Sequence, residues 1–412
     1  MSKTNENKLV PKLRFPEFQN NEEWVTDKVD SLFRLQDGYP FSSSDFTNTQ
    51  KEAKQVVRIS DINNQNKNRE KVYISVSRAK ELGIEKCKVQ KGDLLLSLTG
   101  AAGFNFFIWN ADDAYINQRT IKLVPKKQEN KGLIILLEPL IHSKINAIGT
   151  GQNNNLSKDA LKEIEFPFPQ PNEQQKIATC LSSLDDVIEA ESQKLELLKE
   201  HKKGLLQNLF PQEGEKVPKL RFKEFEDRGE WDEKELGSFC TNLSSGKDKN
   251  VIDGEYELYG STGIIGRTEN ASYEGDFILV ARVGANAGLL NKVNGKFGVT
   301  DNTLVIDLVK KDLINFIFYS LESVGLNKLV FGSGQPLITG GQLKNFSISI
   351  PSSEQEQKKI PNTLSSIDDL IKAQSKKIEA LKLHKKGLLQ GLFPDINEEN
   401  SSNSMELEND RN

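Results

Sequence analysis

The sequence predicts a mixed α/β (α+β) protein in which two globular domains are separated by two long antiparallel coiled-coil helices, arranged as a pseudo-twofold internal repeat. Three observations predict this fold. The 412 residues are too many for one compact core. Much of the chain occurs twice. Each copy closes with a long segment in which apolar residues follow a heptad pattern.

The internal duplication is clearest in two long segments. Residues 173–211 and 356–394 align without a gap at an offset of 183 residues. A shorter repeat, VPKLRFPEF at 10–18 and VPKLRFKEF at 217–225, precedes each domain at an offset of 207 residues. The order of lead, domain and helix is therefore used twice. Other corresponding positions are Trp24 and Trp231, and the loops GTGQ at 149–152 and GSGQ at 332–335.

The repeat also predicts where each part begins and ends. The parts are a first domain with its lead at 1–168, a first helix at 169–211, a second domain with its lead at 212–351, a second helix at 352–394 and an acidic tail at 395–412. The two domains match poorly, but both contain short apolar runs next to glycine, which are typical of strands. These runs are at 92–100, 114–124, 275–284 and 297–308, and helical patterns at 133–147 and 312–328 complete the mixed class.

The heptad segments predict a seam shared by two helices. Positions a and d are apolar in both copies except at two matched slots, which hold Glu191 and Lys202, then Gln374 and Lys385. An apolar seam needs a partner, and each copy is the natural partner of the other. The residues expected in the seam are Leu181, Leu184, Ile188, Leu195, Leu198, Leu364, Ile367, Ile371, Ile378 and Leu381.

Several alternatives remain open for these helices. Either copy alone is also compatible with an ordinary amphipathic helix packed on its own domain. The polar slots either fix the helix register or lie at the seam edge with their charged ends in solvent. The HKK triplets at 201–203 and 384–386 fit contact with a partner subunit or DNA phosphates, or a solvated basic turn. Gly204 and Gly387 indicate a close helix crossing, since glycine otherwise weakens a helix.

Composition and charge favour a cytoplasmic protein. The net charge of −4 is concentrated in the tail, which carries six acidic residues and one arginine and is expected to be disordered. The start of the chain lacks the apolar segment of a secretory signal, and no apolar run is long enough to span a membrane. Cys87, Cys180 and Cys240 have the spacing of neither a metal site nor a disulfide framework.

The order of parts and the repeated motifs resemble the specificity (S) subunits of Type I restriction-modification enzymes. The motifs PKLRFPEF with Trp24, PNEQQKIATCLSSLDDVI and HKKGLLQNLFP each have a counterpart in the second half of the chain. YGSTGIIG at 259–266, followed by ILVARVGANAG at 278–288, looks like a common form of that family's target-recognition domain. The resemblance implies that each domain binds one half of a split DNA site. Because the two domains differ, the target is expected to be asymmetric.

The resemblance further implies a DNA-recognition subunit that is not an enzyme itself. Its partners would be double-stranded DNA, two methyltransferase (M) subunits that use S-adenosylmethionine, and two motor-nuclease (R) subunits that use ATP and Mg²⁺. The sequence has no P-loop, amino-methyltransferase or helicase motif, no His/Cys metal cluster and no evident catalytic triad, so we expect no cofactor or metal in this chain. A protein-binding scaffold and a standalone nucleotide-using enzyme are the alternatives. A DNA mobility-shift assay and a test for nucleotide binding would distinguish them.

Candidate DNA contacts are polar side chains in the predicted loops. Arginine suits guanine edges or phosphates, and Asn and Gln amides suit adenine edges. A single surface arginine is also often only solvated, and Asn-rich loops are also good turns. The GTGQ and GSGQ loops fit either a phosphate cradle or a plain tight turn. The candidates are Arg58, Asn117, Gln118, Arg119, Gln152, Asn153, Arg267, Arg282, Asn286 and Gln335.

Overall fold

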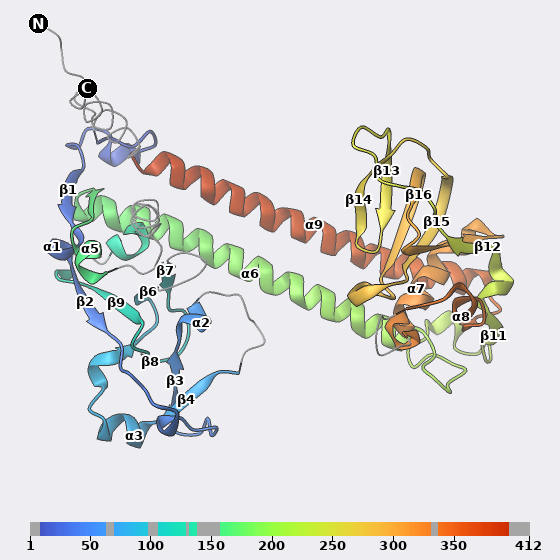
Figure 1. Ribbon diagram of the computed structural model, residues 1–412, viewed down its shortest axis with the longest axis horizontal. Helices are drawn as coiled ribbons and strands as arrows, with labels where there is room; N and C mark the ends of the chain where they lie inside the picture. Colours follow the sequence, from blue (N-terminus) through green and yellow to red (C-terminus); the bar gives the residue numbers. More distant parts are fainter. Residues whose placement is uncertain are drawn as a thin grey trace, which may run out of the picture. The chain divides into compact units, whose positions relative to one another are not determined.

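The computed structural model describes residues 9–62, 70–97, 106–128, 132–137, 157–330 and 337–394. The chain forms two compact units: unit 1 comprises residues 1–189 and 379–412, and unit 2 comprises residues 190–378. Each unit holds one α/β domain, part of helix α6 (Pro171–Leu209) and part of helix α9 (Glu354–Leu392) (Figure 1). Among the described residues, no helix has the length and apolar character needed to cross a lipid bilayer.

Unit 1 is built on two small sheets and one strand pair. The sheets have the orders β2-β9-β6-β7 and β4-β3-β8-β5, and β1 pairs with β10. All of these pairs are antiparallel except β3 with β8. The strands are β1 (Val25–Lys28), β2 (Phe33–Asp37), β3 (Ala53–Val57), β4 (Val72–Ser75), β5 (Lys88–Val89), β6 (Leu94–Ser97), β7 (Phe106–Ile108), β8 (Ala114–Ile116), β9 (Thr120–Pro125) and β10 (Glu165–Phe168). The described residues of this domain also include helices α1 (Val29–Leu32), α2 (Ile59–Ile62), α3 (Val76–Glu81) and α5 (Lys158–Lys162), and residues 133–137 are helical.

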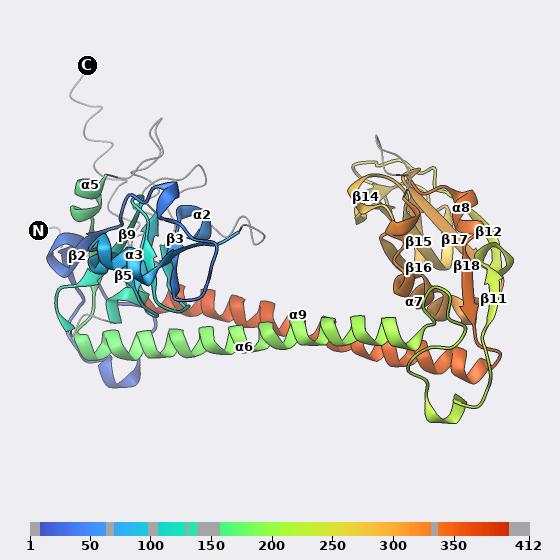
Figure 2. The same ribbon diagram turned by 90° about the horizontal axis from the view of Figure 1, so that it is seen from below.

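Unit 2 contains a single six-stranded sheet of order β12-β17-β15-β16-β13-β14 and the pair β11-β18 (Figures 1 and 2). Only β13 and β16 pair in parallel within this sheet. The strands are β11 (Asp232–Glu235), β12 (Cys240–Ser245), β13 (Tyr256–Gly260), β14 (Gly263–Thr268), β15 (Tyr273–Ala281), β16 (Leu290–Val299), β17 (Thr303–Leu308) and β18 (Ser347–Ile350). Helix α7 (Ile314–Val324) is shorter than the predicted 312–328, and α8 (Gly340–Lys344) follows it. The predicted helix at 133–147 lies mostly outside the described residues.

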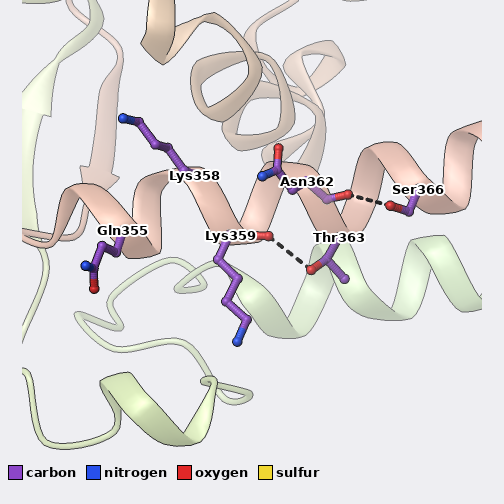
Figure 3. Close-up of a pocket in the computed structure, with 6 residues that line it drawn as sticks. All are labelled: Gln355, Lys358, Lys359, Asn362, Thr363 and Ser366. Atoms are coloured by element: carbon purple, nitrogen blue, oxygen red, sulfur yellow. Dashed lines mark hydrogen bonds between the residues drawn. The ribbon is translucent and has the colours of Figure 1, made fainter.

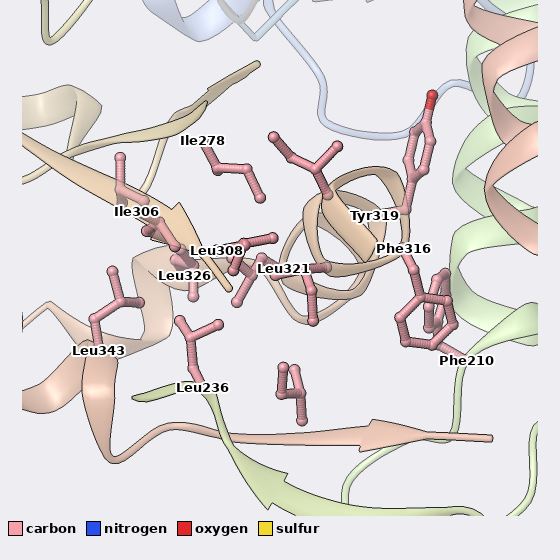
Figure 4. Close-up of a cluster of buried hydrophobic side chains, with 14 of the residues drawn as sticks. Phe210, Leu236, Ile278, Ile306, Leu308, Phe316, Tyr319, Leu321, Leu326 and Leu343 are labelled. Atoms are coloured by element: carbon pink, nitrogen blue, oxygen red, sulfur yellow. The ribbon is translucent and has the colours of Figure 1, made fainter. Parts of the chain in front are cut away.

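One central strand in each domain separates two apolar cores. Side chains alternate between the two faces of a strand, so a continuous apolar run can be buried on both sides. In β6, Leu94 and Leu96 belong to one buried cluster and Leu95 to another. In β15, Ile278 belongs to the core shown in Figure 4, whereas Leu279 belongs to a separate cluster. In both domains, an apolar run next to glycine thus forms a strand that contributes side chains to two cores.

Helices α6 and α9 pack antiparallel in both units. In unit 1, Ile177 and Leu181 near the start of α6 share a hydrophobic cluster with Leu392 at the end of α9. In unit 2, Leu206 near the end of α6 shares a cluster with Leu364 near the start of α9. All ten predicted seam residues are buried or half-buried, as a shared seam requires. The predicted fold class of two α/β domains with two long antiparallel helices is confirmed.

The polar slots of the seam are filled by contacts between the helices. Glu191 and Gln374 stand at equivalent positions of the repeat and meet each other. Gln374 Nε2 donates to Glu191 Oε2 at 2.6 Å and to the Glu191 carbonyl oxygen at 2.9 Å. Lys377 Nζ forms an ion pair with the same carboxylate at 2.5 Å. The hydrogen bond from Gln374, followed by the contact with Lys377, lowers the pKa of Glu191. These contacts favour the register-fixing role for this slot.

The second slot holds an ion pair that occurs twice. Lys202 Nζ lies 2.8 Å from Asp368 Oδ1, and Lys385 Nζ lies 2.6 Å from Asp185 Oδ1. The two pairs are related by the 183-residue offset of the repeat. The middle lysine of each HKK triplet therefore points to the other helix, whereas His201 and its equivalent are exposed.

A set of matched contacts, here called the joint, attaches each lead to the helix ends. Arg14 pairs with Glu173 (Nη2 to Oε2, 2.7 Å), and Arg221 pairs with Glu356 (Nε to Oε1, 2.8 Å). All four side chains are at most 6% exposed, so both ion pairs are buried. The remaining contacts of the joint are Leu13 N–H to Gly391 O (2.7 Å), Leu220 N–H to Asn208 O (2.8 Å), and the edge-to-face ring pairs Trp24–Phe393 (6.0 Å) and Trp231–Phe210 (6.2 Å).

The interior glycines of the helices do not mark a close crossing, so that prediction is wrong. A Cβ atom at Gly204 or Gly387 would meet open space. The close approach lies instead at Gly391, where a Cβ would stand 2.4 Å from Leu13 Cδ1. Glycine at this position lets the first lead pack against the end of α9.

Candidate nucleic-acid interface

In unit 2, several turns meet at one edge of the large sheet. Strand β15 ends where β17 begins, since Ala281 pairs with Thr303. Strand β13 ends at the same edge, because Thr300 N–H, in the turn just before β17, donates to Tyr259 O at 3.0 Å. The turns that follow or precede these strands, at 244–250, 261–262, 282–288 and 300–302, form what is here called the strand-end edge of unit 2. Loops at strand ends are the usual carriers of binding residues.

Hydrogen bonds between the turns hold this edge together. Arg282 N–H donates to Asn302 O at 3.0 Å, and Ser261 Oγ donates to the same carbonyl at 3.3 Å. The loop after β15 needs glycine: Gly288 has a φ of +95°, and a Cβ there would lie 2.6 Å from Asn327 N. Asn286 is exposed within this loop. The edge thus presents polar groups on a backbone fixed by sheet pairing.

The two candidate arginines of unit 2 differ in their hydrogen bonding. Arg267 donates from Nε to Gly254 O and from Nη2 to Glu255 O, both at 2.7 Å, so its guanidinium braces a neighbouring loop. Arg282 has no side-chain hydrogen bond or ion pair among the described residues, and its Nε is buried without an acceptor. A buried donor without an acceptor is costly, so the described residues leave the guanidinium of Arg282 unsatisfied. Of the two, Arg267 is engaged within the domain, whereas the guanidinium of Arg282 is not engaged by the described residues.

Unit 1 has a strand-end edge with the same backbone plan. It comprises residues 38–39 and the turn 117–119, which leads from β8 to β9 as 300–302 leads from β16 to β17. Gly38 N–H donates to Thr120 O at 3.2 Å, and Gly246 N–H donates to Thr303 O at 3.1 Å. A Cβ on either glycine would lie 2.1–2.2 Å from a backbone oxygen, so both positions require glycine. The hydroxyls of both threonines are buried without a hydrogen-bond partner in the described part of the chain.

The side chains presented at the two edges differ. In unit 1, Asn117 Oδ1 accepts a hydrogen bond from Gln118 N–H at 2.6 Å, while Gln118 and Arg119 point into solvent. In unit 2, the equivalent turn reads Thr300-Asp301-Asn302. Exposed Lys247 and Lys249, in the segment that follows β12, add positive charge to that edge. The two edges therefore share their backbone hydrogen bonds but expose different polar and charged side chains.

The remaining candidates are either engaged elsewhere or lie outside the described residues. Arg58 donates from Nη2 to Glu70 O at 2.7 Å and contacts Asp61 through Nε at 3.4 Å, so it closes a loop of unit 1. Gln152, Asn153 and Gln335 lie outside the described residues. Sequence reasoning missed Ser261, Asn302, Lys247 and Lys249. The glycines that precede Lys247 and Ser261 were a local signal for those two turns, whereas Asn302 has no such signal.

A surface pocket lies on the first turns of α9 (Figure 3). It is lined by Gln355, Lys358, Lys359, Asn362, Thr363 and Ser366. Thr363 Oγ1 donates to Lys359 O at 3.0 Å and Ser366 Oγ donates to Asn362 O at 2.9 Å, so both hydroxyls are satisfied within the helix. Among the residues that the structure describes, no group of three or more His, Cys, Asp or Glu side chains could hold a metal ion.

Comparison with known proteins decides the family. The family model described as "Type I restriction modification DNA specificity domain" matches residues 21–200 and 228–383, so it covers both copies of the repeat. The chain belongs to this family. The resemblance seen in the sequence is thereby confirmed.

Individual relatives of the specificity family agree with this membership. The chain is 25% identical to the Type I restriction enzyme MjaVIII specificity subunit of Methanocaldococcus jannaschii over 74% of this chain and 79% of that protein. It is 28% identical to the EcoprrI specificity subunit of Escherichia coli over 115 residues, which span 28% of each chain. The crystal structure of the S subunit of the Type I system from M. genitalium has the same fold, with a TM-score of 0.63 and 19% identity over 94% of this chain and all of that one.

Proposed function

We propose that this specificity subunit recognises a bipartite, asymmetric DNA target and directs methylation and restriction by partner subunits. Each strand-end edge binds one half of the target. The observation that carries the proposal is the pair of edges: the turn at 117–119 and the turn at 300–302 are held by the same backbone hydrogen bonds but present different side chains. Two such edges suit two unlike half-sites.

The side chains at the edges suit direct contact with base edges in the major groove, where every base pair has its own pattern of donors and acceptors. Arg282 suits the O6 and N7 atoms of guanine. Gln118 and Asn286 suit the N6 and N7 atoms of adenine. Asn117 supports Gln118, because its Oδ1 accepts a hydrogen bond from Gln118 N–H. Arg119, Lys247 and Lys249 suit phosphates, which fix the position of a protein on DNA without reading sequence.

The chemistry in this proposal belongs to partner subunits in the cytoplasm. Two methyltransferase (M) subunits would bind S-adenosylmethionine, and two motor-nuclease (R) subunits would use ATP and Mg²⁺. The exposed basic residues at the HKK triplets and the polar face of α9 are available surfaces for such subunits.

The test is to replace Arg282 with alanine in the full chain, expressed with its methyltransferase subunits, and to sequence the methylated sites of the cell. Losing one bidentate base contact costs about 1–3 kcal/mol of discrimination. Arg282→Ala should therefore make one position of one half-site degenerate and leave the other half-site unchanged.

Lys296 supplies the matched control. It is an exposed basic residue of β16 that lies outside the turns of the strand-end edge and pairs with Glu274 near the start of β15. Lys296→Ala should leave the methylated motif as it is. If Arg282→Ala also leaves every position of the motif unchanged, the strand-end edge of unit 2 is not the base-reading surface. If the wild-type chain supports no sequence-specific methylation, the proposed function itself is wrong.

A further inference from the structure

A polar network in unit 2 joins the domain to both long helices. Lys202 Nζ, on α6, lies 2.8 Å from Glu322 Oε1 on α7 and 2.8 Å from Asp368 Oδ1 on α9. Tyr319, also on α7, donates its hydroxyl to Asp368 Oδ2 at 2.7 Å. The ring of Tyr319 lies under the ammonium group of Lys202, 5.5 Å from its centroid. Figure 4 shows Tyr319 on the side of α7 that faces the helix pair.

The network is partly shielded from solvent, and its hydrogen bonds give it a defined geometry. Lys202 is 15% exposed and Glu322 31%. Burial alone would lower the pKa of Lys202, but its hydrogen bonds to Asp368 and Glu322 outweigh this and raise the pKa, so the lysine stays charged. Burial, then the hydrogen bond to Asp368, raises the pKa of Tyr319, so its hydroxyl remains a donor. Hydrogen bonds require a defined geometry, whereas apolar packing is non-directional.

Unit 1 provides an internal comparison, because the part of the network that joins the two helices is also present there. The pair Lys385–Asp185 is the equivalent of Lys202–Asp368 and joins the two helices. At the same offset of 183 residues, which also relates Thr120 to Thr303, Leu136 stands at the position of Tyr319 and Pro139 at that of Glu322. Leu136 is fully buried, and Pro139 lies outside the described residues. Neither residue type can hydrogen-bond to a lysine or a carboxylate through its side chain.

We propose that Tyr319 and Glu322 are positioning residues that fix the orientation of the second recognition domain on the helix pair, and thereby narrow the range of gap lengths accepted between the two half-sites. This inference rests on the proposed function. The ion pairs Lys202–Asp368 and Lys385–Asp185 join the two helices directly, whereas Tyr319 and Glu322 lie on α7 of the domain, so their contribution is to the domain. A domain held by apolar contacts alone can shift in orientation at little cost. A domain that must also keep two charge-assisted hydrogen bonds, Lys202–Glu322 and Tyr319–Asp368, cannot.

The experiment uses the full chain with its partner subunits and the variants Glu322→Gln and Tyr319→Leu, the latter giving unit 2 the residue that unit 1 has. The methylated sites of the cell are sequenced and sorted by gap length. Both half-site sequences should be unchanged. Methylation at sites with a gap one base pair shorter or longer should rise about tenfold relative to wild type, the scale expected for losing a hydrogen bond to a charged group.

Two controls separate positioning from general weakening. Lys385→Met removes the equivalent ion pair of unit 1 and should not broaden the gap. Lys202→Arg keeps a cation beside both carboxylates and should preserve the wild-type gap. Glu322→Gln is nearly isosteric, so it keeps the test possible even if Tyr319→Leu fails to fold.

The outcomes distinguish this inference from the proposed function. Intact half-sites with a broadened gap in Glu322→Gln support the positioning role. Intact half-sites with a single, unchanged gap in that variant overturn the positioning role and leave the proposed function standing. An equal broadening in Lys385→Met also overturns it, because the effect would then come from the helices. Absence of any sequence-specific methylation by the wild-type chain overturns both.

Discussion

The two units are alike at the joint and differ at the strand-end edge. At the joint, the residues themselves are repeated: Arg14 with Glu173 and Arg221 with Glu356 make buried ion pairs of nearly equal length. At the edges, the backbone plan is repeated but the side chains are not, as the turns at 117–119 and 300–302 show. This chain therefore attaches both domains to the helices through the same residues, whereas the side chains exposed at the strand-end edges differ between the domains.

The largest effect should come from breaking the joint. Arg221→Ala leaves the Glu356 carboxylate, whose side chain is fully buried, without its partner. Removing one member of a buried ion pair costs about 3–5 kcal/mol. Chemical denaturation followed by circular dichroism should show this loss in unfolding free energy, with a similar loss for Arg14→Ala. A loss of unfolding free energy below about 1 kcal/mol in either variant would mean that its buried ion pair does not hold the lead to the helix end.

A slightly smaller effect should come from the seam that connects the joints. Leu364 is fully buried, and Leu364→Ala should lower the unfolding free energy by about 2–5 kcal/mol through lost burial and a cavity. Leu370, on the same helix, is 53% exposed and is the matched control, with an expected change of at most about 0.5 kcal/mol for Leu370→Ala. Similar losses in both variants would argue against the heptad seam.

The smallest effect concerns the polar contact between Glu191 and Gln374 and is visible in its pH dependence. The pKa of Glu191 is lowered in the folded state, first by the hydrogen bond from Gln374 and then by that from Lys377. Its stabilising contribution is therefore present above the ordinary glutamate pKa and is lost as the pH falls through the lowered folded-state value. Denaturation at several pH values should show wild type more stable than Glu191→Gln near neutral pH, with the difference vanishing in acid. A difference that does not depend on pH would contradict this assignment.

The sequence predicted the helices well because their signal is local and periodic. A heptad pattern fixes which side of a helix is buried, so Leu184 and Ile371 could be assigned to the seam without knowing the rest of the fold. The slots of Glu191 and Lys202 could not be resolved in the same way. Their partners, Gln374 and Asp368, are more than 160 residues away, and only the antiparallel pairing brings them close.

The candidate DNA contacts were harder to predict, because a loop arginine looks the same whether it is engaged or available. Arg267 and Arg58 hydrogen-bond to backbone carbonyls that no local pattern indicates. Arg282 and Arg119 do lie at strand ends, Arg282 in a glycine-rich stretch and Arg119 beside two amide residues. Ser261 and Asn302 were missed because their proximity depends on the parallel pairing of β13 with β16.

The most direct measurement of the central claim, that one frame carries two independent DNA-reading domains, is an exchange of one domain. Residues 26–168 are replaced with the corresponding domain of another specificity subunit, while both leads and both helices are kept. The methylated sites of cells that express the chimera with the partner subunits are then sequenced. The account predicts that one half-site changes and that the other is retained. A chimera that changes both half-sites, or neither, would contradict it.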